Sequence, residues 1–382
     1  MKLKKFAALT AAIAMALSLA ACGSGSGEAA EADAVTTAKT EAVKDETTAA
    51  KQEENTVPEE TTTEETTTTE PAVVFVEPAA EDFEYNYDAA LKGAVIKKYN
   101  GSAEAIRIPT ELDGDPVVQF SISKSKVTHV EIPDGFASIS EKAFYECPNL
   151  KSVIIPDSVA EIGYGAFSGC KNLESIEIPN RVTVIGSFAF GGCDSLESIE
   201  IPNSVTEIRE QAFSSCDSLK SIEIPNSVTV IGNNAFSWCS SLESITIPDS
   251  ITEFGEQAFY LCSSLKSVTI SDNVKEIGKL AFSNCTSLES ISIPDSVEYI
   301  GDYAFQSCSG LKEVTLPDGV VFGTYVFEKC TSLRNLTLPD NISRRNSVGF
   351  FEGCEALTVT YKGNEYNYTN FWDLYYEIPQ DH

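Results

Sequence analysis

A pattern of apolar and polar positions recurs every 23 residues along most of the chain. The unit Ser198–Cys216 is nearly reproduced by Ser175–Cys193 and by Ser221–Cys239. Self-similarity at a fixed period of roughly 20–50 residues indicates a solenoid, whose coils stack on one another. We therefore expect one elongated core rather than two globular domains, although the chain has 382 residues.

The apolar positions within one coil predict its elements. Leu196, Ile199, Ile201 and Pro202 show the recurring Leu-x-x-Ile-x-Ile-Pro pattern. Residues two apart share one face of a strand, so each coil should hold one inward-facing strand that ends at Pro. The following Val-x-x-Ile-Gly predicts a second short strand, and Ala-Phe-x-x-Cys predicts a short helical turn. Stacking then gives a parallel β-sheet on one face, with second strands and helical turns on the other.

The period changes near the C-terminus, where the spacing of Phe and Cys becomes 22 and then 24. A one-residue deletion near Val320–Gly323 and an insertion near Arg344–Asn346 explain the change. Both are expected in loops, because a one-residue slip within a strand would turn its core face outward.

The repeat resembles a known family. The string Cys-x-x-Leu-x-x-Ile-x-Ile-Pro-x-x-Val-x-x-Ile-Gly-x-x-Ala-Phe, found from about Val127 to Leu357, is similar to the BspA-like class of leucine-rich repeats. Departures are few: Ser271 replaces a Pro, Arg209 a Gly and Val326 an Ala. The resemblance implies a surface protein of the kind found in bacteria and some protists, a few of which act in adhesion or host-matrix binding.

The N-terminus predicts export. Three lysines precede the apolar run Phe6–Leu19, which is too short to span a membrane in the ordinary way. Leu19-Ala20-Ala21-Cys22 resembles the lipobox of bacterial lipoproteins. That resemblance implies that Cys22 is acylated and anchors the protein to membrane lipid. The protein would then lie on the outer face of the cell membrane or be exposed on the cell surface. A plain secretory signal is the alternative.

The chain is therefore expected to have five segments. They are a signal peptide (1–21), a lipid-anchored acidic stalk (22–83), N-terminal capping coils (84–126), the solenoid (127–356) and a C-terminal cap (357–382). The stalk is rich in Thr, Glu and Ala, a composition that buries too little apolar area to fold. In the C-terminal cap, the aromatic residues from Tyr361 to Tyr376 are assigned to cap core in preference to a sugar or protein site.

The formal charge of −30 excludes some partners. Nucleic-acid binding needs clustered Lys and Arg, and attraction to anionic lipid needs a basic surface. Such a chain repels other copies of itself, so we expect a soluble monomer.

Ten Cys occupy equivalent positions of the repeat. Equivalent residues of adjacent coils lie roughly 4.8 Å apart with parallel side chains, whereas a disulfide needs Cβ atoms about 3.5–4.5 Å apart and turned toward each other. We expect buried free thiols, with scattered disulfides and metal binding as alternatives. The chain has only two His, His129 and His382, and no Cys-x-x-Cys pair. We therefore expect no metal site, no cofactor and no catalytic activity.

The outward side of the first strand is the candidate binding face. It is predicted to be acidic in its earlier coils and rich in hydroxyl groups from Thr246 onward. The candidate residues are Glu174, Glu177, Glu197, Glu200, Lys220, Glu223, Thr246, Thr269, Ser292 and Thr315. A solvated face without a ligand is the alternative interpretation.

Three functions remain open from the sequence. The first is a non-catalytic adhesin or protein-binding module whose partner is a host-matrix, mucus or neighbouring-cell surface protein. The second is a structural or scaffolding envelope protein without a soluble ligand. The third is a glycan-binding accessory protein.

Overall fold

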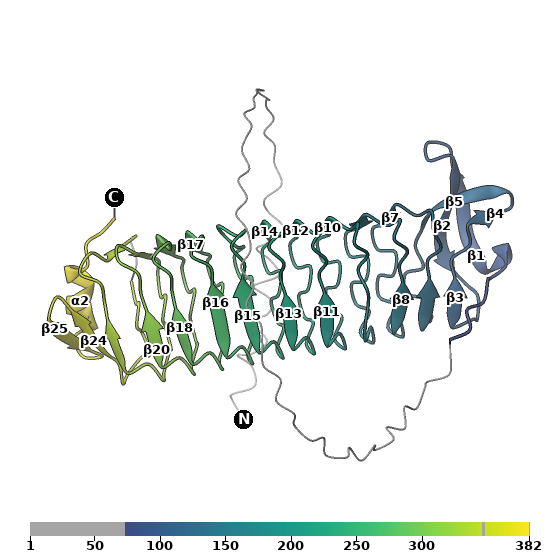
Figure 1. Cartoon of the computed structure of the whole chain (residues 1–382). Coiled ribbons are helices and arrows are strands. Elements are labelled where there is room, and N and C mark those ends of the chain that lie inside the picture. The colour runs from purple at the N-terminus through teal and green to yellow at the C-terminus, as the bar shows by residue number, and fades with distance from the viewer. Residues whose placement is uncertain (1–72, 346–347, 382) are drawn as a thin grey trace, which may run out of the picture. The chain divides into compact units, whose positions relative to one another are not determined.

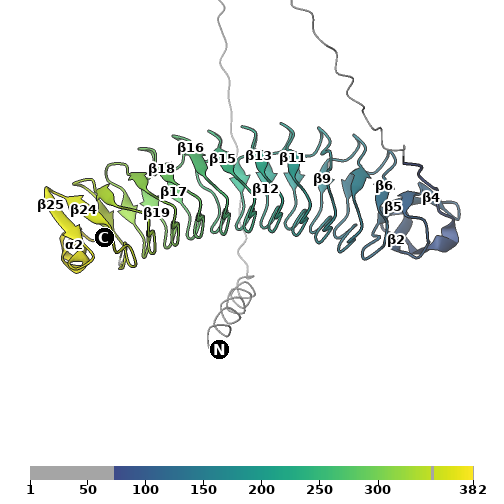
Figure 2. The same cartoon turned by 90° about the horizontal axis from the view of Figure 1, so that it is seen from below.

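The structure is a computed structural model, and it describes residues 73–345 and 348–381. The predicted signal peptide, Cys22 and the predicted stalk as far as residue 72 lie outside the described residues. The chain divides into the units Met1–Thr68 and Thr69–His382, and the second is described here. In it, about 12 coils stack in a single, gently curved row (Figure 1 and Figure 2), which confirms the predicted solenoid.

The Ile-x-Ile segments form the first ladder of parallel strands. Its register joins equivalent residues of adjacent coils, such as Ser198 with Ser221 and Glu200 with Glu223. Inward-facing Ile side chains therefore stack on one another, as the period of 23 predicts. The strands of this ladder are β3 (Ala105–Arg107), β6 (His129–Glu131), β8 (Ser152–Ile154), β11 (Ser198–Glu200), β13 (Ser221–Glu223), β15 (Ser244–Ile247), β16 (Ser267–Ile270), β18 (Ser290–Ser292), β20 (Glu313–Thr315), β22 (Asn335–Thr337) and β24 (Thr358–Tyr361).

The Val-x-x-Ile segments form a second ladder of two-residue strands, as predicted. Ile185 pairs with Ile208 and Ile208 with Ile231, so the same side chain faces the core in each coil. The strands are β7 (Ser138–Ile139), β9 (Glu161–Ile162), β10 (Val184–Ile185), β12 (Glu207–Ile208), β14 (Val230–Ile231), β17 (Glu276–Ile277), β19 (Tyr299–Ile300), β21 (Val321–Phe322) and β23 (Ser343–Arg344).

The return segment of each coil differs from the prediction. The sequence predicts a short helical turn at Ala-Phe-x-x-Cys, but this segment is a run of tight turns. Phe188 and Gly192 have positive φ, of 59° and 72°, so the alternate amides point along the stack and not along a helix axis. The amide of Phe190 accordingly donates to the carbonyl of Ala212 in the next coil, at 2.8 Å. The return segments thus add hydrogen bonds between coils, which a helix would have kept within each coil.

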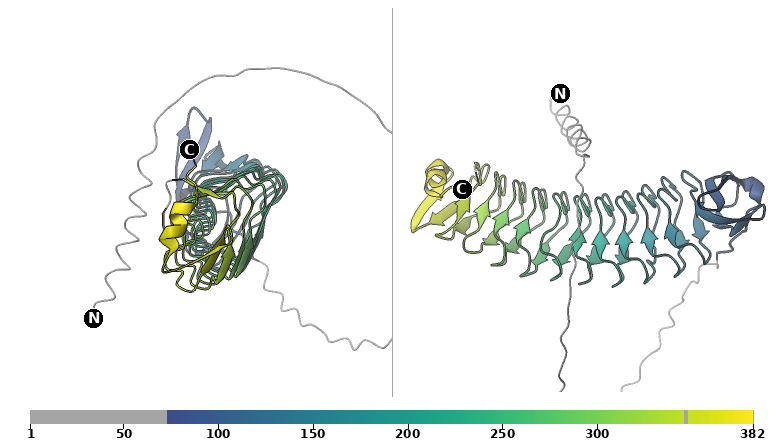
Figure 3. Two further views of the ribbon diagram at one scale, coloured as in Figure 1. Left: turned by 90° about the vertical axis from the view of Figure 1, so that its left-hand side faces the viewer. Right: turned by 90° about the horizontal axis from the view of Figure 1, so that it is seen from above.

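The core is built from stacked copies of the same side chain. The Phe rings of adjacent coils are nearly parallel; those of Phe213 and Phe236 have centroids 5.4 Å apart and planes 3° apart. Both rings are fully buried. Seen along the stack, the coils lie over one another, with the helix of the C-terminal cap on the near end (left panel of Figure 3).

The ten repeat Cys are free and buried, which confirms the prediction for them. Each thiol donates a hydrogen bond to a backbone carbonyl of the preceding coil; Cys239 Sγ lies 3.2 Å from the carbonyl oxygen of Phe213. Burial raises the pKa of the Cys239 thiol to about 12. These Cys are therefore core residues in the protonated form, and their burial keeps them from reacting as thiolates.

A small separate sheet covers the N-terminal end of the stack. It contains β1 (Phe83–Asp88), β2 (Gly93–Tyr99), β5 (Asp115–Phe120) and β4 (Glu111–Leu112), in that order, and is preceded by the 3₁₀ turn η1 (Ala80–Asp82). Among the described residues, the first β-bridge is at Val76, which lies within the segment that the sequence analysis assigns to the stalk. Val76 pairs with Ile106 of β3 and so covers the exposed edge of the first ladder.

The predicted deletion lies in a turn. Thr315 pairs with Ser292, 23 residues away, whereas Val321 pairs with Tyr299, 22 residues away. The one-residue deletion therefore falls between Thr315 and β21, so the residues of β21 keep the same inward and outward positions as in the other coils. In the next coil the inward position is taken by Arg344, which is only 9% exposed.

The C-terminal cap closes both ladders. Strand β24 pairs with β25 (Asn364–Asn367), and the helix α2 (Phe371–Glu377) follows. The chain then returns to the second ladder, where Gln380 bridges to Arg344. The guanidinium of Arg344 donates to the carbonyl of Ile378 at 3.1 Å and to the hydroxyl of Tyr375 at 3.0 Å. One buried cation therefore holds the end of the chain against the last coil.

Candidate binding surface

The outward side of the first ladder carries three parallel rows of side chains, and all ten residues predicted for the binding face are exposed on it. The charged row holds Lys or Glu immediately before each strand. The flanking row is the first strand residue and is mostly Ser. The central row is the third strand residue, and includes Glu200, Glu223, Thr246, Thr269, Ser292 and Thr315; Glu177 holds the equivalent position in a coil whose predicted first strand is not formed.

The charged row forms ion pairs between neighbouring coils. Lys220 Nζ lies 2.7 Å from a carboxylate oxygen of Glu197, and each pair joins residues 23 positions apart. The other pairs are Lys151–Glu174, Lys266–Glu243 and Lys312–Glu289. All of these side chains are at least half exposed, so each pair contributes only about 0.2–1 kcal/mol. Their main effect on the surface is to neutralise Glu174 and Glu197.

The negative charge is therefore concentrated on the central row. Glu177, Glu200 and Glu223 occupy three successive coils and have no ion pair within residues 73–345 and 348–381. Glu200 and Glu223 face each other in register across the ladder. Like charges directly opposite one another on adjacent strands are destabilising, so this row keeps a repulsion that a basic partner would relieve.

Glu200 and Glu223 also line a depression of about 390 Å³ on this face. The other residues that line it are Ser198, Ile199, Ile201, Asn203, Ser221, Ile222 and Pro225. The two carboxylates accept hydrogen bonds only, so the depression suits a ligand that supplies cationic or N–H donors.

The sequence-based prediction missed the ion pairs of the charged row, although the sequence carries a signal for them. Along this row the residues run Lys151, Glu174, Glu197, Lys220, Glu243, Lys266, Glu289, Lys312. Comparing charges at a separation of 23 shows four Lys–Glu pairs. In the earlier coils, the charged row is therefore less acidic than the sequence predicted. Only the central row keeps the predicted negative charge.

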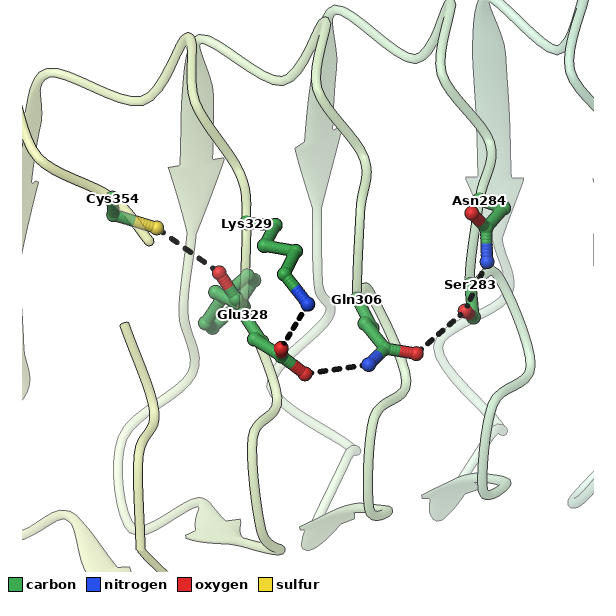
Figure 4. A network of polar contacts seen from close by, with 7 residues as sticks. Ser283, Asn284, Gln306, Glu328, Lys329 and Cys354 are labelled. Carbon is green, nitrogen blue, oxygen red and sulfur yellow. Dashed lines mark hydrogen bonds and ion pairs between the residues drawn. The ribbon is translucent and has the colours of Figure 1, made fainter. Parts of the chain in front are cut away.

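A second polar cluster lies on the return segments of three adjacent coils (Figure 4). Glu328 is only 8% exposed, and its carboxylate accepts hydrogen bonds from Gln306 Nε2 and, at 2.6 Å, from Lys329 Nζ. Gln306 in turn accepts a hydrogen bond from Ser283. The buried charge is thus paired within the cluster, as a stable core requires.

The aromatic residues of the C-terminal cap divide into two groups. Tyr361 and Tyr366 are buried, as expected for cap core. Tyr368, Trp372 and Tyr376 are 56%, 64% and 77% exposed, so the prediction of cap core fails for these three. The sequence could not separate the groups, because the cap lies outside the repeat and its period gives no inward positions.

The repeat region matches a family model. The model describes the BspA type leucine rich repeat region, in six copies, and matches residues 118–243 and 229–358, which is more than half of the chain. The chain belongs to this family. A comparison with curated proteins found no match.

The chain is also similar to several solved structures of bacterial leucine-rich repeat proteins. A leucine rich repeat protein of T. pallidum is 30% identical, over 68% of this chain and 91% of that one, with a TM-score of 0.34. A leucine rich cell surface protein of Faecalibacterium prausnitzii is 24% identical, over 82% and 99%, with a TM-score of 0.35. The pneumococcal vaccine antigen PcpA is 22% identical, over 76% and 88%, with a TM-score of 0.51, a likeness of fold.

Neither a metal site nor a membrane span is found among the described residues of this BspA-type chain. In the part of the chain that the structure describes, no group of three or more His, Cys, Asp or Glu side chains could hold a metal ion. None of the described helices has the length and apolar character that crossing a membrane requires. His129 lies in β6 with its Nδ1 2.9 Å from the hydroxyl of Thr128.

Proposed function

We propose that this BspA-type protein is a non-catalytic cell-surface lipoprotein that binds another protein through the outward face of its first ladder. The partner is a host-matrix, mucus or neighbouring-cell surface protein that presents a basic patch. The observation that carries the proposal is the central row of Glu177, Glu200 and Glu223, with two of its carboxylates lining one depression.

Physical chemistry supports this assignment in two ways. A rigid sheet with repeating outward positions presents an extended surface at low cost in conformational entropy, which suits a protein partner. The three carboxylates would steer a basic partner toward the face and would lose their mutual repulsion on binding. Binding should therefore weaken as ionic strength rises.

Charge reversal on the face tests the proposal. The full chain is incubated with immobilised matrix and mucus proteins, and the variant Glu200→Lys is compared with Glu161→Lys. Glu161 is an exposed residue of β9 in the second ladder and is a matched control. We expect Glu200→Lys to weaken retention on the order of tenfold, and Glu161→Lys to leave it unchanged. Equal retention of both variants would exclude the face as the binding site, and absence of any retained protein would favour the scaffolding function.

The anchor is tested separately. Cys22 lies outside the described residues, and its role rests on the resemblance of Leu19–Cys22 to a lipobox. In a bacterial host, Cys22→Ala should release the protein into the medium, because two or more acyl chains are needed for stable anchoring. A protein that stays with the membrane fraction after this change would contradict the lipoprotein assignment.

A further inference from the structure

The C-terminal cap contains a second hollow, far along the chain from the acidic central row. It has a volume of about 370 Å³, within the range of small-molecule sites. Aromatic rings make up most of its wall, including Phe350, Phe371, Trp372 and Tyr375, and the exposed Glu352 is its one acidic lining residue. These residues come from the last coil and from α2, which the cap brings together.

The rings of the wall are inclined to one another. The Trp372 and Tyr375 ring centroids are 5.8 Å apart with planes at 74°, and those of Phe350 and Tyr375 are 6.4 Å apart with planes at 40°. Rings at steep angles present faces in several directions around one volume. Such an arrangement suits a compact group that touches several faces at once better than a flat sugar ring, which stacks on one.

The charge around the hollow favours a cation. Glu352 lines it, and α2 carries Asp373 and Glu377 and has no Lys or Arg in its sequence. The aromatic faces themselves are the negative ends of ring quadrupoles and attract cations within about 6 Å. Apart from Glu352, the only side chains of the wall with hydrogen-bonding groups are Tyr368, Trp372 and Tyr375. This is a sparse set for a sugar with many hydroxyls.

Two cations lie near the hollow, and only Lys329 is neutralised by an ion pair; the charge of Arg344, which has no carboxylate partner among the described residues, is outnumbered by Glu352, Asp373 and Glu377. Lys329 is held by Glu328 in the polar cluster of the return segments. Arg344 lies with its guanidinium carbon 3.9 Å from the ring centroid of Tyr375. The latter contact also shows, within this protein, that a ring of the wall accepts a cation.

From this geometry we propose that the hollow binds an organic cation, an alkylammonium or guanidinium group held between Trp372, Tyr375 and the carboxylate of Glu352. Such a group can come from a small quaternary ammonium compound or from a Lys or Arg side chain of another protein. This site is independent of the proposed function of the strand face, because no residue is shared between them.

The first test asks whether charge is recognised. The full chain is titrated with choline, with its uncharged isostere 3,3-dimethylbutan-1-ol, and with a five-residue Gly peptide carrying one central Arg. The chain has two Trp, so the indole NMR signal of Trp372 is assigned by Trp238→Phe. We expect choline or the peptide to shift the Trp372 signal, with half-saturation below about 10 mM, and the isostere to bind at least about tenfold more weakly.

The second test locates the site by ligand-detected NMR, which does not depend on Trp372 as a reporter. Trp372→Ala and Glu352→Gln should each weaken cation binding on the order of tenfold. The matched controls are Trp238→Ala, which removes another exposed Trp, and Glu355→Gln, which removes an exposed carboxylate that does not line the hollow. Circular dichroism checks that each variant keeps its fold.

Three results with the cations and the isostere would overturn the proposal. They are equal binding of choline and the isostere, no shift of Trp372 with any cation up to about 100 mM, and unchanged binding in both site variants. A neutral sugar that shifts Trp372 where cations do not would also overturn it, in favour of a glycan. A response to the peptide alone would support the proposal and identify a protein side chain as the source of the cation.

Discussion

The stack of buried thiols should make the stability of this protein steeply dependent on alkaline pH. Burial raises the pKa of all ten repeat Cys above the ordinary value of 9.0, to about 12 for Cys239, Cys308 and Cys354. In the unfolded chain the same thiols titrate near 9.0. The unfolded state therefore loses protons first as pH rises, and stability that is complete below pH 9.0 is lost as pH rises toward about 12.

The magnitude follows from the number of thiols. At pH 10 each unfolded thiol is about one unit above its pKa, which favours unfolding by about 1.4 kcal/mol. Ten thiols that become exposed together amount to at most about 14 kcal/mol, comparable with the whole stability of an ordinary domain. We therefore expect the solenoid to be stable at pH 8 and close to unfolding at pH 10.

Urea unfolding at pH 7 to 10, in the presence of a phosphine reductant, measures this dependence. The triple variant Cys216→Ala, Cys239→Ala, Cys262→Ala starts from a lower stability at pH 7, because buried atoms are lost. Its further loss between pH 7 and pH 10 should be smaller than that of the natural chain by about 4 kcal/mol. Equal losses in the two proteins would refute the reasoning, since other titrating groups are the same in both.

Three further predictions concern the core and the cap. Phe236→Ala should cost about 3–5 kcal/mol in urea unfolding, because the fully buried ring stacks on both neighbouring coils; a loss below about 1 kcal/mol would contradict this. Gly255→Ala places a Cβ 2.4 Å from the backbone nitrogen of Asn233 and should lower stability by about 1–3 kcal/mol, so an unchanged thermal midpoint would be inconsistent with such close coils. Arg344→Met leaves the carbonyl of Ile378 without this donor, and limited proteolysis should then remove the C-terminal tail first; a tail as resistant as that of the natural chain would argue against its role.

Much of the solenoid could be predicted because the period of 23 links local pattern to tertiary position. Once Ile199 is recognised as inward, Ser198 and Glu200 must point outward, and the same holds one coil later at Ser221 and Glu223. The same period places the ten Cys in one buried row. The helical turn predicted for the return segments is wrong, because positive φ at residues such as Phe188 is set by hydrogen bonds to the next coil and not by local helix propensity.

The sequence alone determined which residues are equivalent between coils, and therefore the ladders, the core rows and the outward face. The period also places Lys220 between Glu197 and Glu243 of the adjacent coils, but only the tertiary structure decided that Lys220 pairs with Glu197 and that Glu200 and Glu223 form no ion pair with any described residue. The tertiary structure also decided that Trp372 is exposed beside an aromatic hollow at the end of the stack. The physical reason is that a repeat specifies backbone positions and the possible partners of each charge through its period, whereas the choice between two equivalent partners and the closure of an end depend on side-chain conformation and on residues outside the repeat.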